Sequence, residues 1–111
     1  MVFVPSRPLK ALKKLRAFFV YKLFYTNHYV YIIYSISNDV YYKGYSTDYI
    51  MRLEQHNQGK TTYTKNKGPW KLVYAEELYS KKEVFIKEKM LKRQHRQYLL
   101  WLFKQKTNLI K

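Results

Sequence analysis

One carboxylate stands in an otherwise apolar stripe near the C-terminal end of the chain. Counted at helical spacing from Val84, the stripe contains Glu88, Leu91, His95, Tyr98, Leu99 and Leu102. A carboxylate on a buried helix face needs a cation or a metal ion as its partner. Glu88 is therefore a candidate metal ligand, although one of the many lysines, or plain solvent exposure, would also satisfy it.

Two further groups with useful chemistry lie four residues apart. Arg52 and His56 share one face of a predicted helix. The arginine fork can hold a phosphate with two hydrogen bonds, and a histidine beside it can hold or relay a proton. The alternative is an ordinary solvent-exposed helix face. Tyr31 and Tyr42 lie on two predicted neighbouring strands, and their hydroxyls need partners if they are buried.

Other kinds of catalytic site are excluded by what the sequence lacks. There is no cysteine, so disulfide scaffolds, zinc knuckles and thiol nucleophiles are ruled out. A two-metal nuclease needs several converging carboxylates, but only seven acids exist, and Asp39 and Asp48 fit a turn and a helix cap. The histidines are scattered, and neither a Gly-rich phosphate loop nor a Gly-x-Ser-x-Gly turn occurs. Tyrosines, one arginine and one carboxylate remain.

The composition describes one small, strongly basic domain. The chain has 111 residues, a formal net charge of +15, and 47% hydrophobic and 19% aromatic residues. That apolar fraction can build a core, so a wholly disordered basic tail is excluded. The charge favours a polyanionic partner, nucleic acid first and an anionic membrane surface second.

The order of predicted elements gives the α+β class. Strands are predicted over 29–35 and 40–45, joined by a turn at 37–39. A helix follows from Asp48 to about Gln58, then a loop over 59–70 and a strand over 71–78. Ser80 and Glu83 form a capping box, so a helix starts there and runs through Leu91, with or without a break, to about residue 104. We expect β-β-α-β-α, with a small, mostly antiparallel three-stranded sheet flanked by helices.

The ends of the chain fall outside this domain, which we place at 29–104 with a tail over 105–111. Residues 1–28 are basic and lack acids. They are expected to be a loosely packed extension; the alternative is an amphipathic helix that binds phosphates or a membrane surface. The apolar run at 17–21 is too short for a membrane span and lacks the cleavage site of a signal peptide. We therefore expect a cytoplasmic protein.

Five segments, taken in order, resemble the GIY-YIG endonuclease family, in particular its small single-domain members and the nuclease domain of the nucleotide-excision-repair incision subunit. They are Tyr29-Val30-Tyr31, Tyr42-Lys43-Gly44, the helix segment 52–57, the Gly-Pro-Trp segment 67–74, and the helix segment 87–92. The first motif has Tyr and Val in place of Gly and Ile, and the second has Lys in place of Ile. The tyrosines, Gly44, Arg52 and Glu88 are all present.

The resemblance implies hydrolysis of phosphodiester bonds with one divalent ion, Mg²⁺ or Mn²⁺. DNA is preferred over RNA as the substrate, but the sequence itself does not distinguish the two. Glu88 would hold the ion, Tyr31 would be the general base or orient the water, and Arg52 would stabilise charge on the phosphate. Tyr42 or His56 would relay a proton, and Gly44 would let the sheet backbone approach the substrate. Phosphates would be held by Lys43, Lys60, Lys65, Lys67, Lys87, Lys92, Arg93 and Arg96.

Two other functions remain open. The first is a nucleic-acid-binding module of the same fold that cuts nothing. An acid at position 88 among lysines weakens phosphate binding, which favours catalysis over mere binding. The second is a membrane-surface or scaffold protein that acts through residues 1–28. Because the domain has little room for target selection, a nuclease of this size would also need a protein partner for targeting or a structure-selective substrate.

Overall fold

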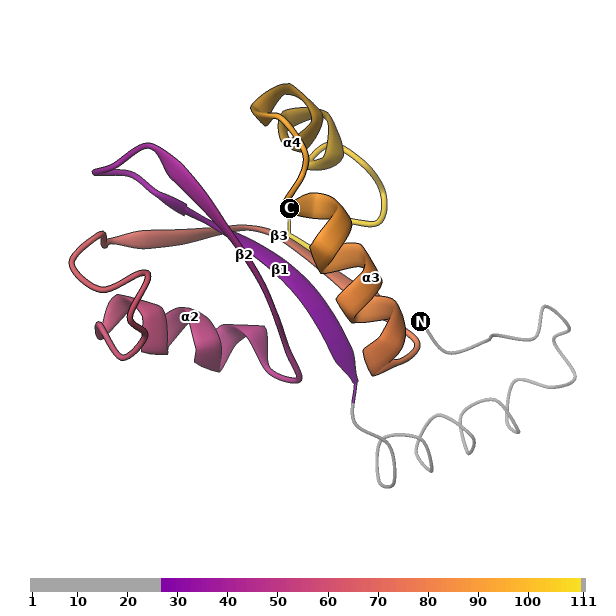
Figure 1. Cartoon of the computed structure of the whole chain (residues 1–111), viewed down its shortest axis with the longest axis horizontal. Coiled ribbons are helices and arrows are strands. Elements are labelled where there is room, and N and C mark those ends of the chain that lie inside the picture. The colour runs from indigo at the N-terminus through magenta and orange to yellow at the C-terminus, as the bar shows by residue number, and fades with distance from the viewer. Residues whose placement is uncertain (1–26, 111) are drawn as a thin grey trace, which may run out of the picture.

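The computed structural model describes residues 27–110, and the expectations for residues 1–26 lie outside the described residues. The elements follow the predicted order (Figure 1). They are β1 (His28–Ser35), β2 (Val40–Ser46), α2 (Tyr49–Asn57), β3 (Trp70–Leu78), α3 (Lys81–Leu91) and α4 (Arg96–Leu102). This arrangement confirms the α+β class.

The three strands form one antiparallel sheet in the order β2-β1-β3. The central strand β1 is buried on both faces, since Val30, Tyr31, Ile32 and Ile33 are all inaccessible to solvent. Alternate side chains of a strand point to opposite faces. Val30 and Ile32 therefore enter one core, and Tyr31 and Ile33 enter the other.

Helices cover the two faces separately (Figure 1). Leu53 of α2 packs on the face that carries Tyr31. Leu91 of α3 and Leu99 and Leu102 of α4 pack on the face that carries Val30. The edge strand β2 is thus flanked by a helix on each side, and groups from both layers can meet around its open edge.

The apolar stripe that starts at Val84 is divided between two helices. The first helix ends at Leu91, and the second begins at Arg96. His95 has an extended backbone, with ψ of 161°, so it precedes the second helix and is exposed instead of lying on the stripe. The break lets Leu99 and Leu102 reach the same core as Leu91. No helix in the part of the chain that the structure describes is both long and apolar enough to span a bilayer.

Residues 105–110, predicted to be a tail, pack against β3. Asn108 is 4% exposed, and its side-chain oxygen accepts a hydrogen bond from the Ala75 amide. Its amide nitrogen donates to the carbonyls of Val73 and Phe103. A buried amide with these partners fixes the segment to the sheet.

Candidate active site

The predicted catalytic residues meet at the open edge of the sheet. Tyr31 from β1, Arg52 from α2 and Glu88 from α3 line one depression of about 330 Å³. The remaining lining residues come from β2 and are Tyr42, Gly44, Tyr45 and Ser46. The depression therefore draws side chains from the sheet and from the helices on both of its faces.

Gly44 makes room for the phenol of Tyr31, its partner across the two strands. A Cβ atom at position 44 would lie 2.6 Å from the Tyr31 hydroxyl and 2.7 Å from Cζ. Both distances are far below van der Waals contact, so a side chain there would displace the ring. The group that comes close to this glycine in the structure is thus Tyr31, whereas the sequence suggested the substrate.

The Tyr31 hydroxyl is anchored inside the protein by His56. The hydroxyl lies 2.8 Å from Nε2 of His56, which is 1% exposed. On the other side of the ring, Nδ1 lies 2.9 Å from Oγ1 of Thr61 and 2.8 Å from Oγ1 of Thr64, and the two threonine hydroxyls also hydrogen-bond to each other. His56 is therefore a buried link and not part of an exposed helix face.

The same burial sets the protonation of the pair. Burial, together with the smaller effect of the positive charge of Arg52, lowers the pKa of His56 to about 4. Burial raises the pKa of Tyr31 to about 12, against the opposing influence of the neighbouring Arg52 guanidinium. Near neutral pH the imidazole is uncharged and the phenol keeps its proton. The neutral phenol of Tyr31, which is the form present near pH 7, is thus a poor proton acceptor in the resting protein.

Tyr42 has a packing role in this structure. Its ring meets the His56 ring edge-on at 5.0 Å and lies 5.5 Å from the ring of Tyr63. Among the described residues, no hydrogen bond joins its hydroxyl to Tyr31 or His56. Of the two residues proposed as a proton relay, only His56 contacts Tyr31 through a hydrogen bond.

Glu88 is the carboxylate of the depression. Its side chain is 15% exposed, and one oxygen lies 3.7 Å from Nζ of Lys92, one helical turn on. Arg52 donates a hydrogen bond of 2.7 Å from Nη1 to the side chain of Gln55. No cluster of three or more histidine, aspartate and glutamate side chains occurs within residues 27–110. A metal ion here would have Glu88 as its protein carboxylate, with water and phosphate oxygens completing its coordination.

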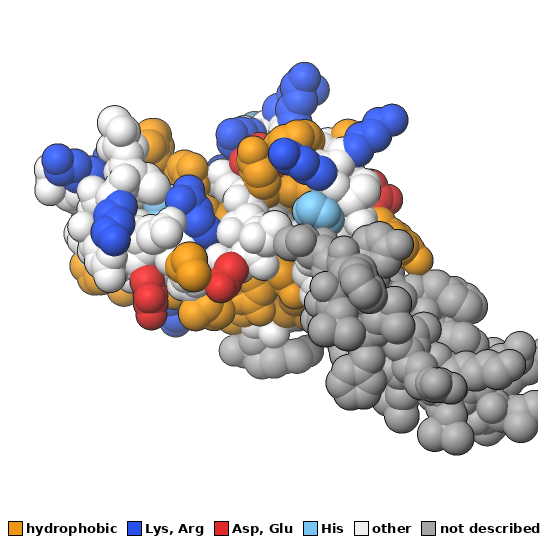
Figure 2. Space-filling view, turned by 90° about the horizontal axis from the view of Figure 1, so that it is seen from below, with side chains coloured by type: hydrophobic (Ala, Val, Ile, Leu, Met, Phe, Trp, Pro, Cys, Tyr) orange, Lys and Arg blue, Asp and Glu red, His pale blue; other side chains and the backbone are white. Residues whose placement is uncertain are grey.

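The predicted phosphate-binding residues differ in their exposure and in their partners within the protein. Lys60, Lys65 and Arg93 are exposed, Lys92 pairs with Glu88, and Lys67 lies 3.9 Å above the Tyr63 ring. Lys43 is half-buried on the α3 side of β2, where burial and the charge of Lys92 lower its pKa. Basic side chains protrude from both ends of the face seen in Figure 2.

Besides Lys92, two of these cations are paired with carboxylates elsewhere in the protein. Lys87 pairs with Glu76 of β3 at 3.3 Å. Arg96 binds the β1–β2 turn, with Nη1 2.8 Å from the Asp39 carboxylate and Nη2 2.9 Å from its carbonyl oxygen. In this structure each of these pairs ties a helix to the sheet, and the role of both cations as phosphate contacts stays a prediction.

Sequence reasoning missed Thr61 and Thr64. Thr64 is 1% exposed, and its carbonyl also accepts a hydrogen bond from the Trp70 indole. The signal in the sequence is a threonine-rich stretch, 61–64, soon after His56, in a loop otherwise marked only by its lysines. The spacing alone does not reveal that the loop folds back on the histidine.

The comparisons with known proteins agree with the geometry. The family model described as the GIY-YIG catalytic domain matches residues 27–104. The chain belongs to the GIY-YIG family. GIY-YIG domains form a nuclease family, so the substrate class is nucleic acid, and members are generally metal-dependent.

Small GIY-YIG relatives resemble this chain over most of their length. A UPF0213 protein of Streptococcus agalactiae is 40% identical over 81 residues, which are 72% of this chain and 91% of the relative. A UPF0213 protein of Staphylococcus aureus is 38% identical over 81 residues, which are 72% of this chain and 98% of the relative. The solution structure of the UPF0213 protein BH0048 from Bacillus halodurans is 35% identical, covers 73% of this chain and 86% of that chain, and has a TM-score of 0.47.

Proposed function

We propose that this GIY-YIG protein is an endonuclease that hydrolyses phosphodiester bonds in DNA with one divalent metal ion, Mg²⁺ or Mn²⁺. The observation that carries the proposal is the meeting of Tyr31, Arg52 and Glu88 in one open depression. A phenol, a guanidinium and a carboxylate are the groups needed to place a water molecule, a phosphate and a cation together.

Glu88 fits the requirement for a hard divalent cation. Mg²⁺ usually keeps several water ligands and is bound through one or two carboxylates together with substrate phosphates. A bound ion would supply Lewis-acid polarisation of the phosphate and stabilisation of the leaving oxygen. Glu88 would exchange its Lys92 ion pair for the cation, and the pair is easily given up because Lys92 is 57% exposed.

Arg52 would hold the scissile phosphate. Its guanidinium lines the depression, and its side-chain contact with Gln55 restrains its orientation. A planar fork of donors matches two phosphate oxygens, and a donor held in place stabilises charge that develops in the transition state. The anionic substrate would also offset the positive charge that lowers the pKa of His56.

Tyr31 and His56 would move the proton of the attacking water together. As the water oxygen bonds to phosphorus, its proton passes to the Tyr31 oxygen, and the phenolic proton passes to Nε2 of His56. The phosphorus–oxygen bond to the leaving group breaks, and the leaving oxygen is protonated from solvent. This route avoids a free phenolate, which the raised pKa of Tyr31 disfavours. It also requires Nδ1 to carry a proton, which Thr61 or Thr64 can accept as a hydrogen bond.

A binding module that does not cut is the second candidate. The Lys92–Glu88 pair favours it, since a structural ion pair accounts for the acid without any metal. A binder of this kind would act in the cytoplasm and would hold nucleic-acid phosphates with the same surface lysines. In either role, a protein partner would supply target selection.

The deciding experiment is a nicking assay on supercoiled plasmid and on branched DNA, with RNA as a further arm. Each substrate is incubated with Mg²⁺, Mn²⁺ or EDTA. Wild type is compared with Glu88→Ala and with Glu54→Ala, an exposed glutamate on α2. We expect metal-dependent nicking that is lost in Glu88→Ala and kept in Glu54→Ala. Binding without cutting, equal in all three proteins, would replace the nuclease with the binding module.

A further inference from the structure

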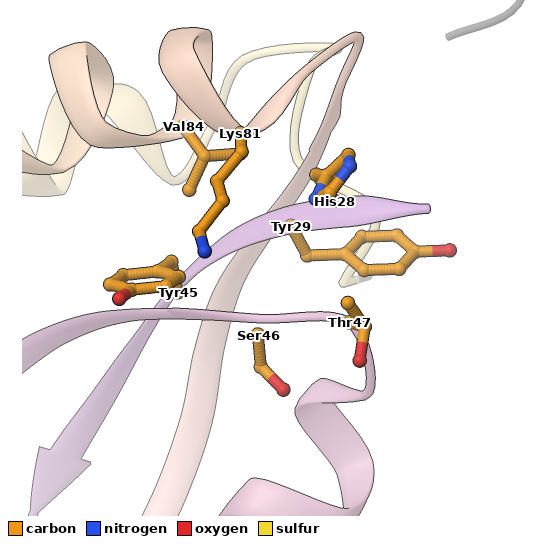
Figure 3. A pocket seen from close by; sticks show the side chains of 7 residues that line it. All are labelled: His28, Tyr29, Tyr45, Ser46, Thr47, Lys81 and Val84. Atoms are coloured by element: carbon orange, nitrogen blue, oxygen red, sulfur yellow. The ribbon is translucent and has the colours of Figure 1, made fainter. Parts of the chain in front are cut away.

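A second pocket opens next to the candidate active site, on the α3 side of β2. It has a volume of about 200 Å³. Figure 3 shows Lys81 and Val84 extending from α3 toward Tyr45 of β2, with His28 at the start of β1.

The two cavities share a wall. Tyr45 and Ser46 line both the pocket and the depression that holds Tyr31, Arg52 and Glu88. A nucleic-acid strand whose phosphate lies in the depression would therefore bring the adjoining nucleotide to the pocket.

The pocket wall offers an aromatic face that is held in place. The Tyr45 ring is 41% exposed and meets the Phe85 ring edge-on, with centroids 4.8 Å apart and an interplanar angle of 88°. Val84, 1% exposed, forms part of the apolar floor. A ring fixed by a neighbour loses little conformational freedom when a flat ligand stacks on it.

The charge of the pocket suits an anionic ligand. Lys81 supplies a cationic group and His28 and Thr47 supply polar groups, and no carboxylate from residues 27–110 lines it. The volume is below the range of about 300–1,000 Å³ that is usual for drug-sized ligands, so it suits one ring system. An aromatic face beside a cation is the combination with which proteins bind the bases and backbone of single strands.

We propose that this pocket binds the unpaired nucleobase adjacent to the scissile phosphate, with Tyr45 as the stacking surface and Lys81 near the flanking phosphate. The inference rests on the proposed function, because the phosphate in the depression determines which base reaches the pocket. A base in a duplex must first be unstacked and unpaired, which costs a few kcal/mol, so the pocket favours a base from a single strand, a flap or a branch point. The substrate class is therefore DNA with an unpaired nucleotide.

The test measures binding in EDTA, where the wild-type protein cannot use a metal to cut. Fluorescence anisotropy at one fixed salt concentration compares a single-stranded oligonucleotide with a blunt duplex of the same length. The variants are Tyr45→Ala and Lys81→Gln. The matched controls are Trp101→Ala, an aromatic residue of α4 that is 53% exposed, and Lys82→Gln, the exposed neighbour of Lys81.

We expect Tyr45→Ala to weaken single-strand binding about tenfold and duplex binding little, in keeping with the measured effect of removing one stacked aromatic residue. Lys81→Gln should weaken single-strand binding more than Lys82→Gln does. Equal losses for single strand and duplex, or a Tyr45→Ala loss no larger than that of Trp101→Ala, would overturn the proposal.

A second measurement needs no variant and covers the case in which Tyr45→Ala fails to fold. Wild type in EDTA is irradiated with oligonucleotides that carry 5-iododeoxyuridine at successive positions, and cross-linked residues are mapped by mass spectrometry. A cross-link to Tyr45 from an unpaired position supports the pocket, and cross-links confined to other residues refute it. Single-strand binding through Tyr45 without metal-dependent cleavage would keep the pocket and reject the nuclease, so the two proposals fail separately.

Discussion

The Tyr31 hydroxyl and Nε2 of His56 lie 2.8 Å apart in the interior, beneath the open edge of the sheet. Mainly because of burial, the pKa of Tyr31 is raised to about 12 and the pKa of His56 is lowered to about 4. Neither group ionises in the resting protein near pH 7. Transfer of the phenolic proton to the imidazole is therefore unfavourable in the resting protein.

The burial of His56 makes stability depend on pH. Between an unfolded pKa of about 6.5 and a folded pKa of about 4, the unfolded chain binds a proton that the folded chain does not. The free energy of unfolding should therefore be fully retained above pH 6.5 and fall by up to about 3 kcal/mol as the pH is lowered to 4. Urea denaturation across this range measures it.

His56→Gln is the control for that titration. Glutamine is neutral throughout, so the variant should be less stable at pH 7 but lose less stability on acidification. Other groups also cause a loss of stability in acid, such as the Asp39 carboxyl, whose pKa is held low by Tyr34 and Arg96. That loss is the same in both proteins. Parallel curves for wild type and variant would show that His56 is not the group responsible.

The two threonines should act as positioning residues for the imidazole. Thr64→Val removes one of the hydroxyls on Nδ1, so the ring is oriented less firmly and its proton is held less well. We expect the cleavage rate constant kcat to fall about tenfold or more, as for loss of a general acid–base component, with KM nearly unchanged. Thr64→Ser should restore most of the rate.

Thr62→Val is the matched control, because Thr62 is exposed and lies between the two threonines that bind His56. It should leave both kinetic constants unchanged. A rise in KM without a change in kcat for Thr64→Val would assign that residue to substrate binding instead.

Gly44→Ala should damage the site through Tyr31. The added methyl carbon would sit 2.6 Å from the Tyr31 hydroxyl, so the ring must leave its place against the strand and its contact with His56 must lengthen. Overpacking of this kind costs about 1–3 kcal/mol of stability. Circular dichroism melts and the nicking assay measure both losses.

Gly68→Ala provides the comparison for that variant. Its added methyl would meet nothing closer than 3.6 Å, which is ordinary contact. A Gly44→Ala protein as stable and as active as Gly68→Ala would mean that Tyr31 has more freedom than the structure gives it.

The three strands, α2 and α3 were predictable because each has a local signal, whereas α4 begins at a residue without a side-chain cap. As the sequence predicted, Asp48 caps α2 by accepting from the Met51 amide and Ser80 caps α3 by accepting from the Glu83 amide. The Glu83 carboxylate accepts from the Tyr79 amide and does not complete the predicted box at Ser80.

The two-sided burial of β1 was less accessible to sequence reasoning. Strand alternation separates Tyr31 from Ile32, but the burial of both faces depends on which helices pack there, α2 on one face and α3 with α4 on the other.

The residues of the candidate site that belong to a sequence motif were predictable. Those that join the site only through a long-range contact were not. Tyr31, Arg52 and Glu88 were named in advance and line one depression. Thr64 reaches His56 only because the loop folds back, and Arg96 is held by Asp39, 57 residues earlier in the chain. Neither contact follows from residue type or spacing.

Arg52 should affect cleavage more than binding. Removing one preorganised donor to developing charge costs roughly 3 kcal/mol, which is on the order of a hundredfold in kcat. Arg52→Ala should lose about that much, Arg52→Lys should lose less, and Lys104→Ala, at an exposed position outside the predicted phosphate contacts, should lose little. A loss confined to DNA affinity would reduce Arg52 to a phosphate contact.

The same substitution has a second readout that needs no substrate. Because the Arg52 charge contributes to the lowered pKa of His56, Arg52→Ala should move that pKa upward, toward the ordinary value, while burial keeps it below 6.5. An NMR titration of the His56 ring protons measures the shift, with Lys104→Ala as the reference. An unchanged His56 pKa together with lost cleavage would place Arg52 on the phosphate alone, and an unchanged pKa with full activity would remove it from the site.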